Sequence, residues 1–414
     1  MSLTNYVQII NYLENQETFH YGEDLQRIFR SLGLSVDPAK VIIVAGTNGK
    51  GTTGAVLQTL LRESGKNIGF FSSPPLKKTN ERIKFNCRDI TDEEFCDLFL
   101  QVDELIHDYN PSYFEYLTFM AVYYFFEWHK NDTDFAIFEV GLGGTLDATN
   151  VIPHDISVIT KIGMDHMDVL GNSLEEIARN KFGIIQKNNR VFHTKFDSAI
   201  ANLARSCAVE KSAQFTEACD CSLRVDVIGK YPEFFIVSPW GEFSLSLPGK
   251  RAMENTALAM TVFADIVPNA GKYMHAVQKT YWPGRMEKIF CYNREIFFSG
   301  DHNVPGIESL LELLPYYMYG RDHVCFVVGI CRDKEHEAIL RKLANFPGAK
   351  LYLTETPVKT LKIQEYATDF LEMAVAVDAN PQSALAAAIA DAQANDLIVV
   401  TGSLYLIGLL KSYF

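Results

Sequence analysis

Apolar runs alternate with amphipathic stretches along most of the chain. Near the N-terminus, VIIVAG at residues 41–46 predicts a buried strand, residues 51–63 predict a helix, and NIGFFSS at 67–73 predicts the next strand. Segments that are apolar at every position are typical of parallel strands whose two faces are covered by helices. These elements therefore predict a βαβ unit at the start of a doubly wound α/β sheet.

The alternation continues beyond this unit. Further helices and strands are predicted at residues 91–106 (with Thr91 as N-cap), 114–128, 135–144, 156–163, 254–266 and 273–280. Between residues 224 and 247, apolar and polar positions alternate one by one. This change of period predicts a small antiparallel appendage.

A second α/β region comes after a break in the pattern. Pro283 and Gly284, in WPGRME, interrupt a helical stretch and predict a connection. Apolar strands are then predicted at residues 295–300, 324–330, 350–355, 373–378 and 397–403, and helices such as 383–393 alternate with them. A chain of 414 residues is also long enough for two cores. We therefore predict a larger domain over 1–282, with the appendage, and a smaller Rossmann-like domain over 283–414.

The composition narrows the possible partners. The chain has 38 Lys and Arg against 51 Asp and Glu, a formal net charge of −13, which disfavours nucleic acid. Its eight cysteines form no CxxC pair, which argues against a zinc site or a disulfide framework. No signal peptide or membrane-spanning stretch is recognisable. We therefore expect a cytoplasmic monomer that binds neither nucleic acid nor a membrane.

The segment AGTNGKGTT, at the junction of the first predicted strand and helix, carries the clearest chemistry. Successive backbone N–H groups at the positive end of a helix form an anion site, to which Lys50 adds a charge and Thr52 a hydroxyl. The strict GxxxxGK[ST] pattern is not met, because Val44 occupies the first glycine position and Gly51 precedes Thr52. We predict that this segment binds nucleotide phosphate through Gly46, Thr47, Asn48, Gly49, Lys50, Gly51 and Thr52.

Two further polar residues stand just after predicted strands. Glu139 and His166 lie where the carboxyl ends of parallel strands meet, which is where a Mg²⁺–ATP enzyme needs its hard ligands. Taken alone, Glu139 could instead be a capped loop carboxylate and His166 a packed core histidine. The neighbouring phosphate loop favours the metal interpretation.

AGTNGKGTT resembles the phosphate loop of the folylpolyglutamate synthase and dihydrofolate synthase family, within the Mur ligase superfamily. The resemblance continues in order through SSPPL, NERI, FEYLT, FEVGLGGTLDATN, ITKIGMDHMDVLG, SLEEIARNKFGII, PGRME, GDHN, RDK and VVTGSLYLIG. It spans nearly the whole chain, and it implies a ligase that uses ATP and Mg²⁺.

The resemblance also implies roles for individual residues. It makes Ser73, Glu139 and His166 magnesium ligands, with Thr52 beside them, and places Asn255 near the adenine and Arg285 on the triphosphate. It implies that Lys181 is a carbamate that holds a second Mg²⁺; on its own, a lysine near the end of a helix capped by Ser173 would be a surface cation. The expected catalytic residues are Lys50, Lys181, His166, Arg285 and His302.

Three places depart from the family pattern. Where the family has SPH, this chain has Ser73, Pro74 and Pro75. The family's HQxxN reads RAMEN at residues 251–255, so Arg251 replaces the histidine, and the family's DGAHN reads SGDHN at residues 299–303. The aspartate of DGAHN is therefore missing at Ser299, and a new one stands at Asp301. We expect Asp301 to replace the missing carboxylate at the nucleotide, although neighbouring strand positions usually face opposite ways.

The expected reaction is ATP-dependent amide formation through an acyl phosphate, with L-glutamate as the amine. The resemblance implies a folate substrate, either dihydropteroate or a tetrahydrofolate that is extended through the γ-carboxyl of its glutamate. The residues do not decide between them, and we expect a bifunctional enzyme that uses both. Phe19, Tyr21 and Phe29 are either stacking faces for a pterin or core residues. Two alternatives stay open: a Mur-type ligase with a different amino acid and carboxylate, and a nucleotide-binding regulator without turnover.

Overall fold

An eight-stranded sheet forms the centre of the first of two units. The computed structural model describes residues 5–414, and the first unit comprises residues up to 162 together with 170–219 and 255–276. The strand order is β4-β3-β2-β5-β1-β6-β7-β8, in which the pairs from β2 to β8 are parallel and β3 and β4 add an antiparallel edge. The strands are β1 (Val41–Ala45), β2 (Ile68–Phe71), β3 (Ile83–Phe85), β4 (Arg88–Asp89), β5 (Phe135–Glu139), β6 (Ile156–Ile159), β7 (Arg190–His193) and β8 (Gln214–Glu217).

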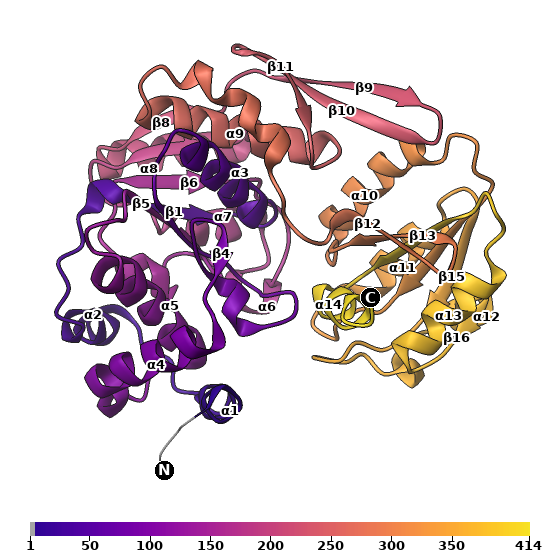
Figure 1. Cartoon of the computed structure of the whole chain (residues 1–414), viewed down its shortest axis with the longest axis horizontal. Helices are drawn as coiled ribbons and strands as arrows, with labels where there is room; N and C mark the ends of the chain where they lie inside the picture. Colours follow the sequence, from indigo (N-terminus) through magenta and orange to yellow (C-terminus); the bar gives the residue numbers. More distant parts are fainter. Residues whose placement is uncertain (1–4) are drawn as a thin grey trace. The chain divides into compact units, whose positions relative to one another are not determined.

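Strand β1 lies between β5 and β6, and all five of its residues are buried. This position explains why VIIVA is apolar throughout, since both faces of the strand are covered. The loop after β1 therefore begins at the middle of the sheet (Figure 1).

Helices of this unit form where the sequence predicts them, as α4 and α5 show. Thr91 caps α4 and accepts from the Glu94 N–H, while the Glu94 side chain accepts from the Thr91 N–H, a capping box that confirms the predicted start. The predicted helix at 114–128 begins as α5 and ends in a π-helical turn, Tyr124–Trp128. The helices are α1 (Tyr6–Glu14), α2 (Gly22–Ser31), α3 (Lys50–Glu63), α4 (Asp92–Ile106), α5 (Tyr113–Tyr123), α7 (Leu174–Phe182), α8 (Ser198–Lys211) and α9 (Lys250–Ile266), of which α9 begins in the second unit.

The second unit contains two sheets. It comprises residues 163–169, 220–254 and 277–414. The predicted appendage is a separate antiparallel sheet of β9 (Ser222–Ile228), β10 (Tyr231–Ser238) and β11 (Gly241–Leu245), and β10 contacts α10 (Val304–Tyr317). The other sheet has the order β12-β13-β17-β14-β15-β16 and is parallel except for β12. The predicted two-part α/β class is therefore confirmed.

Helices of the second unit contact the strands of the six-stranded sheet. Its strands are β12 (Arg285–Cys291), β13 (Arg294–Ser299), β14 (Val324–Val328), β15 (Ala349–Leu353), β16 (Ala376–Val377) and β17 (Leu397–Thr401). Besides α10, the helices of the unit are α6 (Met167–Leu170, which crosses the unit boundary), α11 (His336–Ala344), α12 (Thr368–Met373), α13 (Pro381–Asp391) and α14 (Leu404–Lys411).

The predicted connection is a turn at Pro283 and Gly284. The strand that follows was not predicted: Arg285 is the first residue of β12, which pairs with β13 as an antiparallel edge strand. Pro283 and Gly284 end the preceding segment, and the strand begins immediately after them. The domain boundary at 282/283 stays a prediction.

Two general expectations concern the whole chain. No helix within residues 5–414 is long and apolar enough to cross a membrane. The eight cysteines are all free thiols in the described part of the chain.

At Gly54, in α3, side-chain packing and helix propensity predict opposite effects of a substitution by alanine. A Cβ there would lie 2.5 Å from the Phe70 ring of β2. Glycine to alanine in a helix interior ordinarily stabilises by about 0.5–1 kcal/mol. We instead expect Gly54→Ala to lower the free energy of unfolding by about 1–3 kcal/mol through overpacking, measured by urea denaturation. Adding Phe70→Leu should recover part of this loss, whereas a Gly54→Ala protein as stable as the parent would contradict the packing.

Candidate active site

The loop between β1 and α3 is shaped by two glycines. Gly46 has φ of 145° and Gly49, the N-cap of α3, has φ of 97°, values that side-chain-bearing residues rarely adopt. The Thr47 N–H donates to the Lys161 carbonyl at 2.9 Å, which anchors the loop beside β6. Helix α3 then begins at Lys50, so its positive end faces the predicted phosphate site.

Close neighbours leave no room for side chains at these glycines. A Cβ on Gly46 would lie 1.9 Å from Thr160 Oγ1, and one on Gly49 would lie 2.3 Å from Asn255 Oδ1. Asn255 is itself buried, at 3% exposure. Asn255, which was predicted near the adenine, therefore packs directly against the loop.

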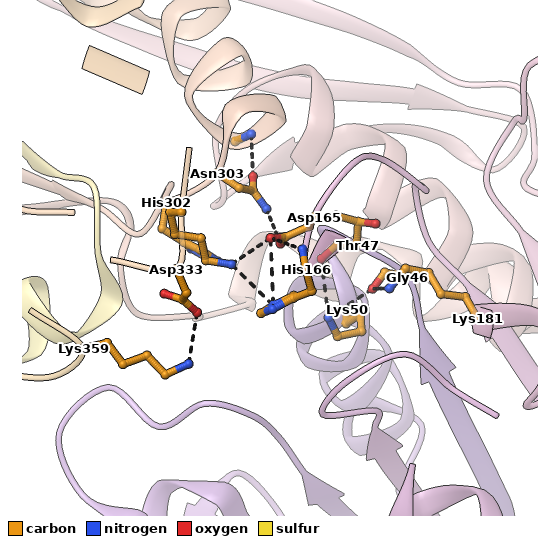
Figure 2. A network of polar contacts seen from close by, with 12 residues as sticks. Gly46, Thr47, Lys50, Asp165, His166, Lys181, His302, Asn303, Asp333 and Lys359 are labelled. Atoms are coloured by element: carbon orange, nitrogen blue, oxygen red, sulfur yellow. Dashed lines mark hydrogen bonds and ion pairs between the residues drawn. The ribbon is translucent and has the colours of Figure 1, made fainter. Parts of the chain in front are cut away.

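Two lysine side chains converge on one carbonyl of this loop. Lys50 Nζ donates to the Gly46 carbonyl at 3.2 Å and to that of Thr47 at 3.4 Å, and Lys181 Nζ donates to Gly46 at 3.1 Å. Figure 2 shows both side chains directed toward Gly46. The Lys50 ammonium and the positive end of α3 together form a site suited to an anion of high charge.

Lys181 is not a surface cation. It is only 4% exposed, so the interpretation as a solvated charge at a helix end is wrong. Helix α7 begins with a capping box in which Ser173 accepts from the Glu176 N–H at 3.2 Å. The position of Lys181 two turns later turns its side chain into the protein, toward the phosphate loop.

The structure brings Ser73 and Glu139 together. Ser73 lies just beyond β2 and Glu139 ends the neighbouring parallel strand β5, and the Ser73 N–H donates to Glu139 Oε2 at 3.1 Å. Arg82 donates to Ser73 Oγ at 2.9 Å. Glu139 and Thr52 are each 4% exposed.

This donor set fits magnesium. A buried carboxylate and hydroxyl groups are the hard oxygen ligands that Mg²⁺ prefers. Within residues 5–414, no three His, Cys, Asp or Glu side chains are grouped to hold a metal ion by themselves. A magnesium ion at Glu139 would therefore complete its shell with hydroxyl, water or phosphate oxygens, as is usual for this ion.

His166 belongs to the second unit and lies in a charged cluster there. Asp165 accepts from Asn303 Nδ2 at 2.8 Å (Figure 2). It also accepts from Lys334 Nζ at 2.7 Å, and Lys334 Nζ lies 3.4 Å from His166 Nε2. Burial alone would raise the pKa of Asp165, but the Lys334 and His166 charges and these hydrogen bonds hold that pKa well below its ordinary value. Asp165 is therefore a permanent anion at neutral pH. His166 has a φ of 50°, in the left-handed region.

Sequence reasoning assigned no role to Asp165 or Lys334. Both stand in segments that resemble the family, GMDHMD and RDK, and this was the available signal. Their contact joins residues 169 positions apart and could not be read from spacing.

His302 and Arg285 are neighbours in the second unit. A Cβ added to Gly300 would lie 3.3 Å from an Arg285 guanidinium nitrogen, and the Gly300 N–H donates to the Gly284 carbonyl at 2.7 Å. His302 Nδ1 donates to the Gly300 carbonyl at 2.8 Å. Burial lowers the pKa of His302, and the positive charge of Lys334 lowers it further. The imidazole is therefore neutral at pH 7. Asp301, beside them, pairs with Arg251.

The three candidate stacking residues differ in their exposure to solvent. Phe29 is buried and belongs to the core, whereas Phe19 and Tyr21 are 65% and 53% exposed. Between them, His20 is held by Glu115, which accepts from the His20 N–H at 2.8 Å and lies 2.9 Å from its Nδ1. The same carboxylate accepts from the Ser112 N–H at 2.8 Å, at the start of α5.

Comparison with known proteins identifies the family. The model of the Mur ligase middle domain matches residues 44–263, and that of the Mur ligase glutamate ligase domain matches residues 284–404. A dihydrofolate synthase/folylpolyglutamate synthase of Bacillus subtilis is 30% identical over 404 residues, which are 92% of each chain. The chain belongs to the folylpolyglutamate synthase and dihydrofolate synthase family. It is therefore an ATP-dependent ligase, with ATP and Mg²⁺ as cofactors.

Solved structures of this family share the whole fold. The structure of Escherichia coli FolC in complex with DHPP and ADP has a TM-score of 0.82 and 26% identity, and the match covers 99% of this chain and 98% of that one. A complex of FPGS with AMPPCP and folate has a TM-score of 0.83 and 26% identity, with 99% of each chain covered. The site residues of this chain therefore lie on a fold that it shares with these solved structures.

The contact between Gly49 and Asn255 predicts a selective loss of nucleotide binding. Gly49→Ala should weaken binding of AMPPCP at least about tenfold, since a displaced loop amide loses a charge-assisted hydrogen bond of about 1.5–3 kcal/mol. Isothermal titration calorimetry measures this affinity. Gly65→Ala is the matched control, because Gly65 also has positive φ, at 84°, but no atom within 4 Å of its added Cβ. Gly65→Ala should bind AMPPCP normally; equal losses in both variants would attribute the effect to backbone strain alone.

Proposed function

We propose that the chain joins L-glutamate to a folate and to dihydropteroate at the expense of ATP. The observation that carries this proposal is the loop between β1 and α3, where the positive end of α3 and the Lys50 ammonium lie together beside Gly46. Such a site suits a triphosphate, and the Bacillus subtilis relative is named for both activities. The names of the solved relatives include ADP with DHPP, and AMPPCP with folate.

The reaction proceeds through an acyl phosphate. A substrate carboxylate attacks the γ-phosphorus of ATP and ADP leaves; the glutamate amine then attacks the acyl carbon and phosphate leaves. The N–H groups of residues 47–51 and the Lys50 ammonium bind the phosphates and neutralise charge that develops on them. Mg²⁺, when bound at Ser73, Glu139 and Thr52, would supply Lewis-acid stabilisation of the phosphate oxygens. His166 is proposed as a further ligand.

Lys181 is proposed to act as a carbamate. Its neutral amine adds CO₂ to give N-carboxylysine and releases a proton, which replaces a cation with an anion that can hold a second Mg²⁺. The Lys181 side chain is buried beside the Gly46 carbonyl of the phosphate loop. The carbamate keeps one N–H, which can still donate to the Gly46 carbonyl.

The second unit is proposed to supply Arg285 and His302. Arg285 would neutralise charge on the triphosphate, and the neutral imidazole of His302 would donate or accept a hydrogen bond without adding charge. Asn255 would bind the nucleotide next to Gly49. We further propose that exposed Phe19 and Tyr21 contact the pterin, and that the enzyme is a cytoplasmic monomer.

An activity assay tests the proposal directly. Purified protein should release ADP and phosphate only when glutamate is present together with dihydropteroate or a reduced folylmonoglutamate. Lys50→Ala should lower this rate at least about 100-fold, because a preorganised charge at the phosphate is lost. Lys66→Ala, which removes a half-exposed lysine paired with Asp134, is the control and should keep the parental rate. Activity only with another amino acid or carboxylate, or nucleotide binding without turnover, would contradict the proposal.

The carbamate has its own test. Lys181→Ala should abolish glutamate-dependent turnover, and millimolar acetate or formate should restore a measurable part of it by supplying the missing carboxylate. Lys187→Ala, at an exposed lysine after the same helix, should be unaffected. Undiminished turnover of Lys181→Ala, or a loss that no short carboxylic acid rescues, would exclude the carbamate role.

A further inference from the structure

Three residues that depart from the family pattern contact one another within the second unit. Arg251 donates to Asp301 Oδ1 at 2.9 Å, and the Ser299 hydroxyl donates to Asp301 Oδ2 at 2.7 Å. The Arg251 and Asp301 side chains are only 19% and 11% exposed. Both carboxylate oxygens of Asp301 are thus engaged by residues that are themselves departures.

The charges explain why the departures occur together. Relative to DGAHN, the negative charge has moved two positions along the chain, from 299 to 301, and a positive charge at 251 faces its new position. A largely buried charge without a partner is strongly destabilising. Restoring a carboxylate at 299 would place it against Asp301, because the side chains of these two residues already lie within hydrogen-bond distance.

Arg251 also holds the beginning of α10. Its guanidinium donates to the Gly306 carbonyl at 2.9 Å and to Ser309 Oγ at 3.0 Å. These acceptors lie in the first two turns of α10, while Asp301 lies in the turn that precedes the helix. One side chain therefore links the turn to the helix.

The turn between these contacts carries His302, a proposed active-site residue. Residues 300–303 contain His302 and Asn303, and Asn303 caps α10 by accepting from the Gly306 N–H at 2.9 Å. The Asp301 carbonyl accepts from the Gly402 N–H at 3.0 Å and from the Thr401 hydroxyl at 3.1 Å. With the backbone of Asp301 fixed to β17 and its side chain fixed to Arg251, the turn has little freedom to shift.

We propose that Arg251 is a positioning residue of the ligase reaction, acting through Asp301 to hold the turn that carries His302 and Asn303. Asp301 is then a structural anion and not a ligand of the nucleotide, and Ser299 is its neutral partner. This inference rests on the proposed function for its effect on turnover. Its structural part, the coupling of Arg251 to Asp301, does not depend on any activity.

A double-mutant cycle with Arg251→Gln and Asp301→Asn tests the coupling. Each single variant strands one buried charge and should lower Tm by about 3–6 °C, whereas the double variant should lose clearly less than the sum. Lys342→Gln and Glu308→Gln provide the control, since this exposed ion pair also involves α10 and should show almost no coupling. Additive losses in the Arg251–Asp301 cycle would overturn the inference.

Kinetics separate positioning from nucleotide contact. Each single variant should lower kcat about tenfold or more, because a displaced reacting group is costly, while KM for ATP changes less than about threefold. A large rise in KM for ATP in Asp301→Asn, with Arg251→Gln unaffected, would show that Asp301 binds the nucleotide and would overturn the inference. If no variant and no parent protein is active, the proposed function fails, while the Tm cycle still decides the coupling.

Ser299→Asp should change Tm in opposite directions depending on whether Asp301 is present. In the parental protein it should lower Tm, because it places two carboxylates in contact. In an Asp301→Ala background the same substitution should raise Tm, because the new carboxylate can accept from Arg251 instead. The same effect in both backgrounds would contradict the proposed dependence among the three positions.

Discussion

The phosphate loop depends on close contact between backbone and side chains at its two glycines. Gly46 touches Thr160, and Gly49 touches Asn255, so the loop takes a path that is closed to any larger residue. This path leaves the Gly46 carbonyl accessible to lysines from two helices, α3 and α7. Because β1 occupies the interior of the sheet, the loop is fixed on both flanks, and the positive site is preorganised before any phosphate binds.

Local patterns were sufficient for elements whose boundaries depend on nearby residues. The start of α4 is set by the reciprocal bonds of Thr91 and Glu94, and β1 by an unbroken apolar run. Strand β12 was missed because Pro283 and Gly284 end one element immediately before another begins, and a helix breaker carries no information about the conformation of the next residues. The burial of Lys181 was also inaccessible to local reasoning, since the last turn of a helix ordinarily favours an exposed cation.

Long-range contacts account for most of what the sequence could not reveal at the site. Asp165 and Lys334 meet across 169 positions, and Arg251 meets Asp301 across 50. Sequence reasoning assigned no role to Asp165 or Lys334 and did not connect Arg251 with Asp301, because only the fold brings these opposite charges together. A protein with a formal net charge of −13 can still bind a polyphosphate, because the net charge does not describe the local electric field beside Lys50 and the positive end of α3.

Glu115 performs two tasks with one carboxylate. It caps the first turn of α5 through Ser112, and it holds His20, which stands between the exposed residues Phe19 and Tyr21 in the sequence. The aromatic segment is consequently tied to a buried helix end and does not behave as a loose surface strip. A compound that displaced this segment to reach the surface beneath it would also have to break both contacts between His20 and the buried Glu115 carboxylate, so a competitor that binds alongside the segment and leaves it in place avoids that cost.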